Sequence, residues 1–321
     1  MSDKDNIKGI SFGLVSLFFV SMQPIIANSR PQVLDAYIFA AMAVVVMALL
    51  FLPLLILDQS RLKNQLEKEP LNRENLEKKL HGWKNHKKLL IYIGINFGVA
   101  QILFFIAYEL AGAISTSLAQ QTTIIFALLF GYFINHDKIT KTQIIFAAIL
   151  FFGLFLAITQ GSFDLITINL GIFVMIATAA LWMLAHALIR PVFKNKEITV
   201  YQLGFIRNAI GSIFLFSTYF IFYPAENIHL LFDGINIIFF VLIGLFYGLD
   251  ILCWYKCLSY IEVSRGSVLV SPMPIVVALL AFIFLGEIMT LFHAIGAIII
   301  IMSIFMIVRV KKEITPLAIK S

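Results

Sequence analysis

Apolar runs of about 20 residues recur along the chain, and they decide what it can fold into. A helix needs roughly 20 largely apolar residues to cross the hydrocarbon core of a bilayer. Ten runs of this kind can be drawn in the 321 residues, over about 9–27, 34–57, 88–108, 112–134, 141–160, 166–189, 199–223, 234–259, 264–285 and 288–309. The sequence therefore predicts an all-α integral membrane protein with ten transmembrane helices.

The composition agrees with this fold class. Hydrophobic residues make up 60% of the chain and charged residues 13%, against roughly 45–50% and about 25% in soluble proteins. The first run follows a segment with two Asp and two Lys and has no A-x-A-like cleavage site, so we expect a span and not a signal peptide. Cys253 and Cys257 lie four residues apart in one apolar run and are expected to be packing residues. No metal and no cofactor are predicted.

The placement of basic residues predicts the orientation of the chain. With the N-terminus in the cytoplasm, all but three of the 24 Lys and Arg residues fall in cytoplasmic segments; the exceptions are Arg30, Arg207 and Lys256. Because basic residues collect in cytoplasmic loops, both termini are predicted to be cytoplasmic, in the plasma membrane of a prokaryote. The net charge of +6 then reflects topology and does not indicate a nucleic-acid partner.

The chain is expected to consist of two halves with five spans each, with a charged insert inside the first half. Helices 1 and 2 occupy 1–57, a charged cytoplasmic insert 58–87, helices 3–5 residues 88–161, the second half 162–310 and a cytoplasmic tail 311–321. The insert has Leu62, Leu66, Leu76 and Leu80 at helical spacing. It is either a solvated hairpin or an amphipathic helix on anionic lipid headgroups.

The two halves match one another at a shift of 150 residues. Gly94-x-x-x-Gly98 falls on Gly244-x-x-x-Gly248, and further matches are Ser117 on Ser267, Asp137 on Glu287 and Thr140 on Thr290. Because each half has an odd number of spans, the second half would be inverted relative to the first. Inverted repeats are typical of secondary transporters, whose substrate sites lie near the bilayer midplane between the halves.

Two prolines, Pro272 and Pro274, interrupt the ninth run. Each removes a backbone hydrogen bond and tends to kink a helix. Carbonyls freed beside Ser271 would bind solute or let a half-helix flex during gating; a kink used only for packing is the alternative. The first half has Thr122 and Ile124 at the matching positions, so no proline predicts a kink in the fourth span.

A set of short motifs carries a family resemblance. It consists of Ser271-Pro272-Met273-Pro274, Leu285-Gly286-Glu287 and Gly296, and it is supported by Gly171, Trp182 and Arg207. On these residues the chain resembles the drug/metabolite transporter superfamily and, within it, the EamA-type permeases, over essentially its whole length. The resemblance implies a secondary transporter that moves a small metabolite, amino acid or amphiphilic solute by alternating access, with export as the expected direction.

The fourth span is the most polar of the ten. Thr116, Gln120 and Thr123 share one helical face by their i, i+4, i+7 spacing, and Gln121 lies beside it. Polar groups that face lipid cost free energy, so this face is expected to point into the bundle. It either lines a water-filled substrate cavity or makes interhelical hydrogen bonds, which typically contribute about 0.6 kcal/mol each.

Ionisable residues inside spans are candidates for function because burying a charge is costly. Asp250 is interpreted as a proton-coupling carboxylate or a partner for a cationic substrate; an ion pair with Arg207 or Lys256 is the alternative. Arg207 is suited to bind a substrate carboxylate bidentately. His186 lies one turn from Trp182 and is either a proton shuttle or a buried, hydrogen-bonded histidine.

Aromatic residues of the sixth and eighth spans form a further candidate group. Trp182, Tyr247 and Trp254, with Tyr255, would make an aromatic box for a hydrophobic or cationic solute. Packing, or a place in the interfacial aromatic belt, is the other interpretation.

The function classes can be narrowed further by motifs. No Walker sequence is present, so ATP is not the direct energy source, and proton coupling is a candidate. The sequences H-E-x-x-H and G-x-S-x-G are also absent, which argues against a membrane-embedded enzyme. A nucleotide-sugar transporter of the same superfamily is the alternative, although only Arg207 and Lys256 are basic groups inside spans. The expected partners are a small-molecule solute and the lipid bilayer.

Overall fold

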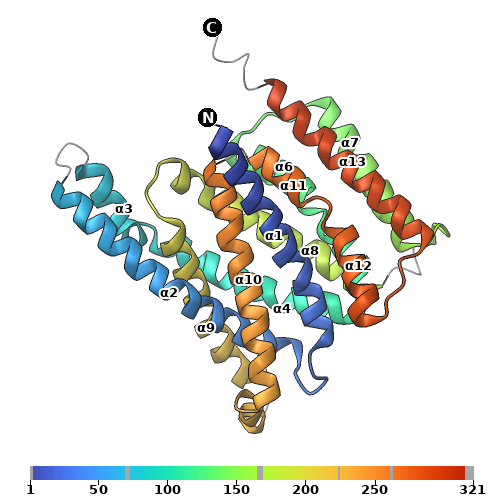
Figure 1. Cartoon of the computed structure of the whole chain (residues 1–321), viewed down its shortest axis with the longest axis horizontal. Coiled ribbons are helices and arrows are strands. Elements are labelled where there is room, and N and C mark those ends of the chain that lie inside the picture. The colour runs from blue at the N-terminus through green and yellow to red at the C-terminus, as the bar shows by residue number, and fades with distance from the viewer. Residues whose placement is uncertain (1–2, 69–72, 165–168, 223–224, 261–262, 315–321) are drawn as a thin grey trace. The chain divides into compact units, whose positions relative to one another are not determined.

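The computed structural model describes residues 3–68, 73–164, 169–222, 225–260 and 263–314, which are helical with no strand in these ranges. The elements, shown in Figure 1, are α1 (Asp3–Ser29), α2 (Ala36–Lys68), α3 (Arg73–Asn85), α4 (Lys87–Ala111), α5 (Ala113–Gln120), α6 (Thr123–Asn135), α7 (Lys141–Ile158), α8 (Leu170–Lys194), α9 (Val200–Phe222), the 3-10 helix η3 (Ala225–Leu231), α10 (Gly234–Tyr260), α11 (Val263–Val270), α12 (Met273–Leu285) and α13 (Leu291–Ile314).

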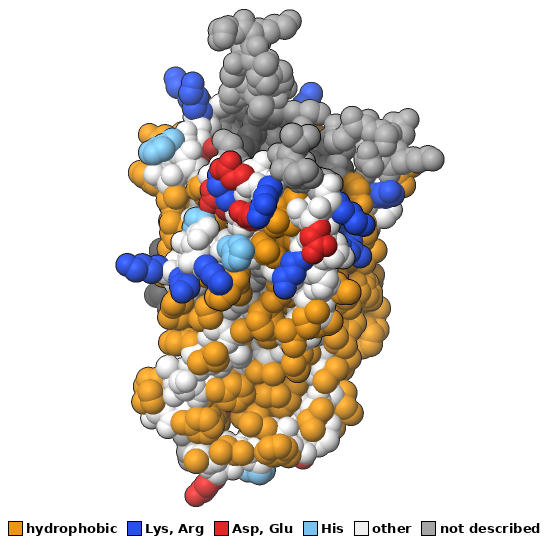
Figure 2. Space-filling view, turned by 90° about the vertical axis from the view of Figure 1, so that its left-hand side faces the viewer, with side chains coloured by type: hydrophobic (Ala, Val, Ile, Leu, Met, Phe, Trp, Pro, Cys, Tyr) orange, Lys and Arg blue, Asp and Glu red, His pale blue; other side chains and the backbone are white. Residues whose placement is uncertain are grey.

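Ten helical segments among the described residues are long and apolar enough to cross a membrane. The predicted all-α membrane fold with ten spans is therefore confirmed; α5 and α6 together make the fourth span. Large apolar side chains face outwards along these segments, for example Ile221 and Phe222, each 72% exposed. On the face drawn in Figure 2, hydrophobic side chains form a broad surface, and Lys and Arg side chains gather towards one end of it.

The charged insert is a helical hairpin, apart from residues 69–72, which lie outside the described ranges. α2 continues beyond the apolar run to Lys68, and α3 packs back against it. Leu62 and Leu76 are buried, so two of the four regularly spaced leucines serve packing. These two apolar positions are used within the protein, while the solvated hairpin and the helix on lipid headgroups both stay predictions.

The chain divides into two compact units that do not follow the two halves of the sequence. The first unit comprises Met1–Ser29, Ile106–Ala179 and Leu249–Ser321, and the second comprises Arg30–Phe105 and Ala180–Gly248. The helices α4, α8 and α10 each contribute to both units. Each unit therefore draws residues from both halves of the chain, an arrangement that the linear order of the spans does not predict.

Within the first unit, α7 and α13 pack side by side (Figure 1) through a contact between two glycines. A Cβ atom on Gly296 would lie 2.5 Å from the carbonyl oxygen of Gly153, and one on Gly153 would lie 2.7 Å from Cγ2 of Ile299. Small residues at such crossings let helix backbones approach closely, which is how helices associate where lipid removes the hydrophobic driving force. In the same unit, α1 packs on α11 and α12.

Within the second unit, both predicted G-x-x-x-G motifs lie at close helix contacts. A Cβ on Gly94 of α4 would lie 2.6 Å from Cβ of Ile210 in α9. A Cβ on Gly244 of α10 would lie 2.4 Å from Cβ of Val46 in α2. The two motifs, 150 residues apart, thus have the same structural role in different helix pairs.

The fourth and ninth spans have matching local structure. α5 and α11 each have eight residues, α6 and α12 each have thirteen, and both pairs of helices begin and end 150 residues apart. His136 and Gly286 end α6 and α12 in left-handed conformations, with φ of 55° and 71°. The hydroxyls of Thr140 and Thr290 then accept the backbone N–H of Gln143 and His293. The repeat is thus visible in helix bounds and caps, while the inversion of the second half stays a prediction.

The fourth span is broken although it contains no proline, which the sequence did not predict. At the break, Gln121 and Thr122 donate their N–H groups to Leu118 and Ala119, three residues back, at 3.1 Å. The hydroxyl of Thr122 donates to the carbonyl of Ala119 at 2.7 Å. A threonine side chain that competes for a backbone carbonyl bends a helix, and i→i+3 bonding tightens it locally. Thr122 thus lies at the interruption of the fourth span, at the position that Pro272 occupies in the ninth span.

Replacing Gly296 with alanine should lower the stability of the first unit. The added methyl group has no room beside the Gly153 carbonyl, and overpacking of this kind costs roughly 1–3 kcal/mol. Gly234 is the matched control because nothing lies within 4 Å of a Cβ built there. In detergent, we expect Gly296→Ala to unfold at a lower temperature than the native protein and Gly234→Ala to unfold at the native temperature. Equal shifts in the two variants would contradict the close contact between Gly153 and Gly296.

Candidate functional site

The carboxylate of Asp250, on the part of α10 that belongs to the first unit, is held by two side chains of α1. Its Oδ1 accepts the hydroxyl of Ser16 at 2.6 Å, and its Oδ2 accepts the amide of Gln23 at 3.1 Å. Ser16 and Gln23 are almost fully buried, and their spacing of seven residues puts them on one helical face. Both donors are neutral, so they orient the carboxylate without neutralising its charge.

Lys256, one of the two basic residues proposed as a partner for Asp250, also has an aromatic contact. Its Nζ lies 5.8 Å from the ring centre of Phe12 in α1, within the same unit. A cation over an aromatic face is stabilised by roughly 0.5–1 kcal/mol at exposed sites and more when desolvated. The positive charge of Lys256 therefore has a stabilising contact on α1.

The polar face predicted in the fourth span is divided between packing and accessible positions. Thr116 is fully buried and donates its hydroxyl to the carbonyl of Ala107 at 3.2 Å. Gln120 is half-buried, and its Oε1 accepts the hydroxyl of Tyr108 at 2.9 Å. The hydroxyl of Thr116 thus makes a packing contact with the backbone of α4, and its place in a substrate cavity stays a prediction.

The remaining polar residues of this region lie at the two helix breaks. Gln121 is buried with its Nε2 3.9 Å from the sulfur of Met273, and Thr123 is half-buried at the start of α6. Gln121 and Met273 thus join the broken fourth span to the broken ninth span inside the first unit.

At the break in the ninth span, Ser271 and the two prolines have separate roles. Ser271 is buried and donates its hydroxyl to the carbonyl of Val268 at 2.9 Å. Pro272 is the N-cap of α12, and Pro274 lies in its first turn, where a proline is tolerated because those N–H groups have no intrahelical acceptor. The structure places the interruption at Ser271–Pro272. The side chain of Ser267, which a shift of 150 residues matches with Ser117, lies outside the described ones.

In the second unit, Arg207 of α9 is 4% exposed and stacks on an aromatic ring. Its guanidinium carbon lies 4.1 Å from the ring centre of Phe97 in α4. The ring of His186 in α8 meets the same phenylalanine edge-on, with 5.6 Å between centres. Two of the predicted ionisable site residues are thus brought together by Phe97.

Trp182, one turn before His186 in α8, has a similar aromatic neighbour. Its ring centre lies 5.6 Å from that of Phe104 in α4, and Phe104 lies 5.9 Å from Tyr247 in α10. Two members of the predicted aromatic box, Trp182 and Tyr247, are therefore joined through Phe104. The third, Trp254, is half-buried on the portion of α10 that belongs to the first unit.

Phe97 and Phe104 were not singled out from the sequence. They lie on an almost wholly apolar helix, where two more phenylalanines give no contrast. Gln101 between them was the usable signal, since residues 97, 101 and 104 share one face of α4 by their i, i+4, i+7 spacing.

Glu287 has a structural role that sequence analysis also missed. Its Oε1 accepts the N–H of Ala113 at 2.8 Å, and its Oε2 accepts the N–H of Ile114 at 3.1 Å. These N–H groups begin α5, where the helix dipole favours a negative charge. Gly112, with φ of 73°, turns the chain into α5. The end of the ninth span thus caps the start of the fourth.

A polar network surrounds this cap at the ends of α5, α7 and α13. The imidazole of His293 contacts Oγ of Ser115 at 3.3 Å and Nε2 of Gln160 at 2.9 Å. Thr290 in turn donates its hydroxyl to Gln160 at 2.5 Å. The network fixes the helix ends of the first unit to one another.

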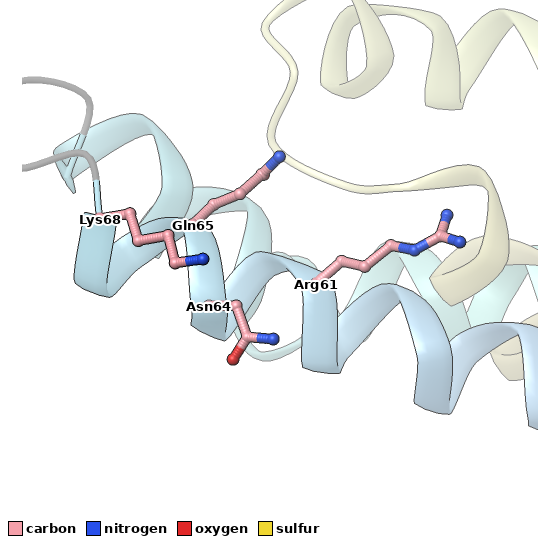
Figure 3. A pocket seen from close by; sticks show the side chains of 4 residues that line it. All are labelled: Arg61, Asn64, Gln65 and Lys68. Carbon is pink, nitrogen blue, oxygen red and sulfur yellow. The ribbon is translucent and has the colours of Figure 1, made fainter.

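A shallow hollow on α2 does not qualify as a site. It is lined by Arg61, Asn64, Gln65 and Lys68 (Figure 3), which all come from one exposed helical stretch. Over the described residues, no three His, Cys, Asp or Glu side chains come close enough to hold a metal ion.

We compared the chain with known protein families, curated proteins and solved structures. The sequence matches the EamA-like transporter family over residues 7–159 and again over 169–309. The chain belongs to this family. Curated proteins gave no match. A solved crystal structure of a protein is similar to this EamA-like chain, with a TM-score of 0.60 and 12% identity over 98% of this chain and 99% of the other, and it shares the fold.

Membership of the EamA-like transporter family confirms the resemblance found in the sequence. With ten apolar helices, the chain is an integral, multi-pass membrane protein. A transporter in a bilayer has a small-molecule solute and lipid as its partners, which agrees with the predicted partners.

Replacing Glu287 with glutamine should destabilise this EamA-like protein. Glutamine removes the charge that faces the N-terminus of α5, and loss of such a cap costs roughly 0.5–2 kcal/mol. We expect a lower unfolding temperature than for the native protein in the same detergent. Glu67→Gln, at an exposed position of α2, is the control and should have no effect. An unchanged unfolding temperature for Glu287→Gln would show that the cap is energetically unimportant.

Proposed function

We propose that this EamA-like protein is a secondary carrier that moves a small organic solute across the membrane by alternating access. The solute is a small metabolite, an amino acid or an amphiphilic compound, and net export is the expected direction. We place the protein in the plasma membrane of a prokaryote with both termini in the cytoplasm. The single observation that carries the proposal is the matched pair of broken helices, α5–α6 and α11–α12.

In secondary transporters, the solute site is typically formed by discontinuous transmembrane helices. Interrupted spans leave backbone carbonyls and helix ends inside the membrane, which is tolerated where they are buried in protein or line a water-filled cavity. In carriers built from inverted repeats, such half-helices lie at the midplane and move during alternating access. The two successive matches to one family support the repeat, and five spans per half would make it an inverted one.

Asp250 is the candidate for coupling transport to a proton gradient. Its carboxylate accepts the hydroxyl of Ser16 at 2.6 Å and the amide of Gln23 at 3.1 Å, and neither of these two donors titrates. Protonation there would change the charge of the first unit without removing either donor. No nucleotide-binding loop is present in the sequence, which leaves an ion or solute gradient as the driving force.

The alternative of a nucleotide-sugar transporter is less well supported. Recognition of a pyrophosphate needs several basic groups facing the cavity. Among the described residues, Arg207 is the one Lys or Arg that is buried. A membrane-embedded enzyme is also disfavoured, since transport is the activity of the family to which the chain belongs.

Counterflow in proteoliposomes tests the carrier mechanism. Vesicles loaded with unlabelled phenylalanine, spermidine, UDP-glucose or ethidium should accumulate the labelled form of at least one of them without ATP. Accumulation driven by exchange is expected of a carrier and not of a channel. Failure of every member of the panel, with correctly folded and inserted protein, would contradict the proposal.

Replacing both Gln120 and Gln121 with leucine should abolish this counterflow. The substitutions remove two amides beside the break of the fourth span, while the protein should still insert and elute as a single species. Gln65→Leu, on the exposed part of α2, is the control variant with full activity expected. Unchanged exchange in the double variant would exclude this face from the solute path.

Asp250→Asn should separate coupling from exchange. Asparagine keeps an oxygen that can accept from Ser16 or Gln23 but has no carboxylate to protonate. We expect counterflow to persist while accumulation driven by an imposed pH gradient is lost. A variant that still responds fully to the pH gradient would remove Asp250 from the coupling step.

A further inference from the structure

The second unit contains a buried cation whose described contacts include no acid. Arg207 is 4% exposed, and its guanidinium lies against the face of Phe97. No Asp or Glu side chain forms a salt bridge with it among the described residues, and its Nε has no hydrogen-bond partner there. A cation–π contact contributes about 2 kcal/mol when desolvated, whereas an unpaired buried ion costs several kcal/mol. The guanidinium of Arg207 therefore lacks an anionic partner among the described residues.

Two further buried donors near the same helices are also unsatisfied. Nε1 of Trp182 and Nε2 of Gln101 have no hydrogen-bond partner in the described part of the chain, and both side chains are more than nine-tenths buried. Buried polar atoms without partners are rare in native proteins, and each calls for an explanation such as a bound molecule. These three groups are donors, which acceptor atoms of a ligand would satisfy; Oδ1 of Asn96, also on α4, is a buried acceptor without a partner among the described residues.

The two ends of the site differ in chemistry, as the spacing of the aromatic side chains along α4 shows. Phe97, which carries Arg207, and Phe104, which contacts Trp182, lie seven residues apart on α4, or roughly 10 Å at 1.5 Å per residue. Gln101 lies between them on the same face. A ligand along this face would meet a cation at one end and aromatic rings with an N–H donor at the other.

We propose that Arg207, Gln101 and Trp182 form a binding site for an amphiphilic monocarboxylate, with Arg207 holding the carboxylate and Phe104 and Trp182 contacting its apolar or aromatic body. The inference rests on the proposed carrier function, because it names the class of solute that the second unit takes. Arginine is suited to this role because its planar fork matches a carboxylate bidentately.

The charge of the site decides between ligand classes. A neutral ligand of the same shape leaves the guanidinium unpaired, and a cationic one is repelled by it. Polyphosphates need more than one basic group. Among the described residues of the second unit, Arg207 is the one buried Lys or Arg. A single carboxylate satisfies the charge of Arg207, and its apolar body suits the aromatic end of the site.

Three probes of matched shape test the proposal: 3-phenylpropanoate, 3-phenylpropanamide and 3-phenylpropylamine. Their binding to the full chain in lipid nanodiscs is measured by isothermal titration calorimetry. We expect saturable binding of the carboxylate and at least tenfold weaker binding of the amide and the amine. Equal affinity for the carboxylate and the amide, or no binding of the carboxylate at millimolar concentration, would overturn the inference.

Variants assign the binding to the named residues. Arg207→Gln should weaken carboxylate binding at least tenfold, and Arg207→Lys should give an intermediate loss because the charge stays and the fork is lost. Trp182→Phe keeps a ring contact with Phe104 but presents a smaller aromatic surface to the phenyl ring of the probe, and should weaken binding two- to tenfold. Arg190→Gln, at an exposed position of α8, is the control with unchanged affinity. If Arg207→Gln does not fold, the Arg207→Lys and Trp182→Phe results decide; native affinity in both would overturn the site.

The two levels of the proposal can fail separately. Counterflow of another solute with no binding of 3-phenylpropanoate would overturn the monocarboxylate site and leave the carrier function standing. Selective carboxylate binding that depends on Arg207, without counterflow of the bound probe or of any other solute, would support the site and contradict the carrier.

Discussion

Inside a bilayer every backbone N–H and carbonyl must find its partner within the protein, and the interruptions of two spans have to meet this constraint. At both breaks a side-chain hydroxyl, of Thr122 in one and Ser271 in the other, donates to a carbonyl three residues back. At the start of α5, where helices always leave N–H groups free, the carboxylate of Glu287 accepts two of them. These contacts satisfy some of the backbone groups that the interruptions leave without helical partners, which helps the half-helices to be accommodated in the membrane.

Close approach of helix backbones supplies the second requirement. Lipid tails are as apolar as leucine, so helices in a membrane associate through packing and not through a hydrophobic driving force. The glycines at 94, 153, 244 and 296 lie where an added Cβ would meet a neighbouring helix at 2.4 to 2.7 Å. The contacts of Gly153 and Gly296 lie inside the first unit, and those of Gly94 and Gly244 lie inside the second.

The sequence was sufficient for the spans and for the repeat, because runs of about 20 apolar residues and a fixed shift of 150 are properties of the chain order itself. It was insufficient for the fourth-span break, since a threonine bends a helix only when its hydroxyl takes a backbone carbonyl, and that choice depends on packing. It also missed Phe97 and Phe104, because one more phenylalanine on an apolar helix carries no periodic signal. The role of Glu287 was equally hidden, as its partners lie 174 residues away in the chain. Local patterns thus predicted elements, and long-range contacts decided which residues form sites.

The two ionisable residues of greatest interest are held by different means. Asp250 is oriented by the hydroxyl of Ser16 and the amide of Gln23, and Arg207 is oriented by the face of Phe97. Neither contact neutralises the charge that it orients. Well-packed apolar residues in place of buried charges are often neutral or stabilising, and a charged side chain at the centre of a span costs about 2.5–3.5 kcal/mol on insertion scales. Arg207, 4% exposed against Phe97, therefore has a cation–π contact that offsets part of its desolvation cost and no acid partner among the described residues. A ligand carboxylate at Arg207 and a proton at Asp250, as proposed above, would account for keeping these charges inside spans.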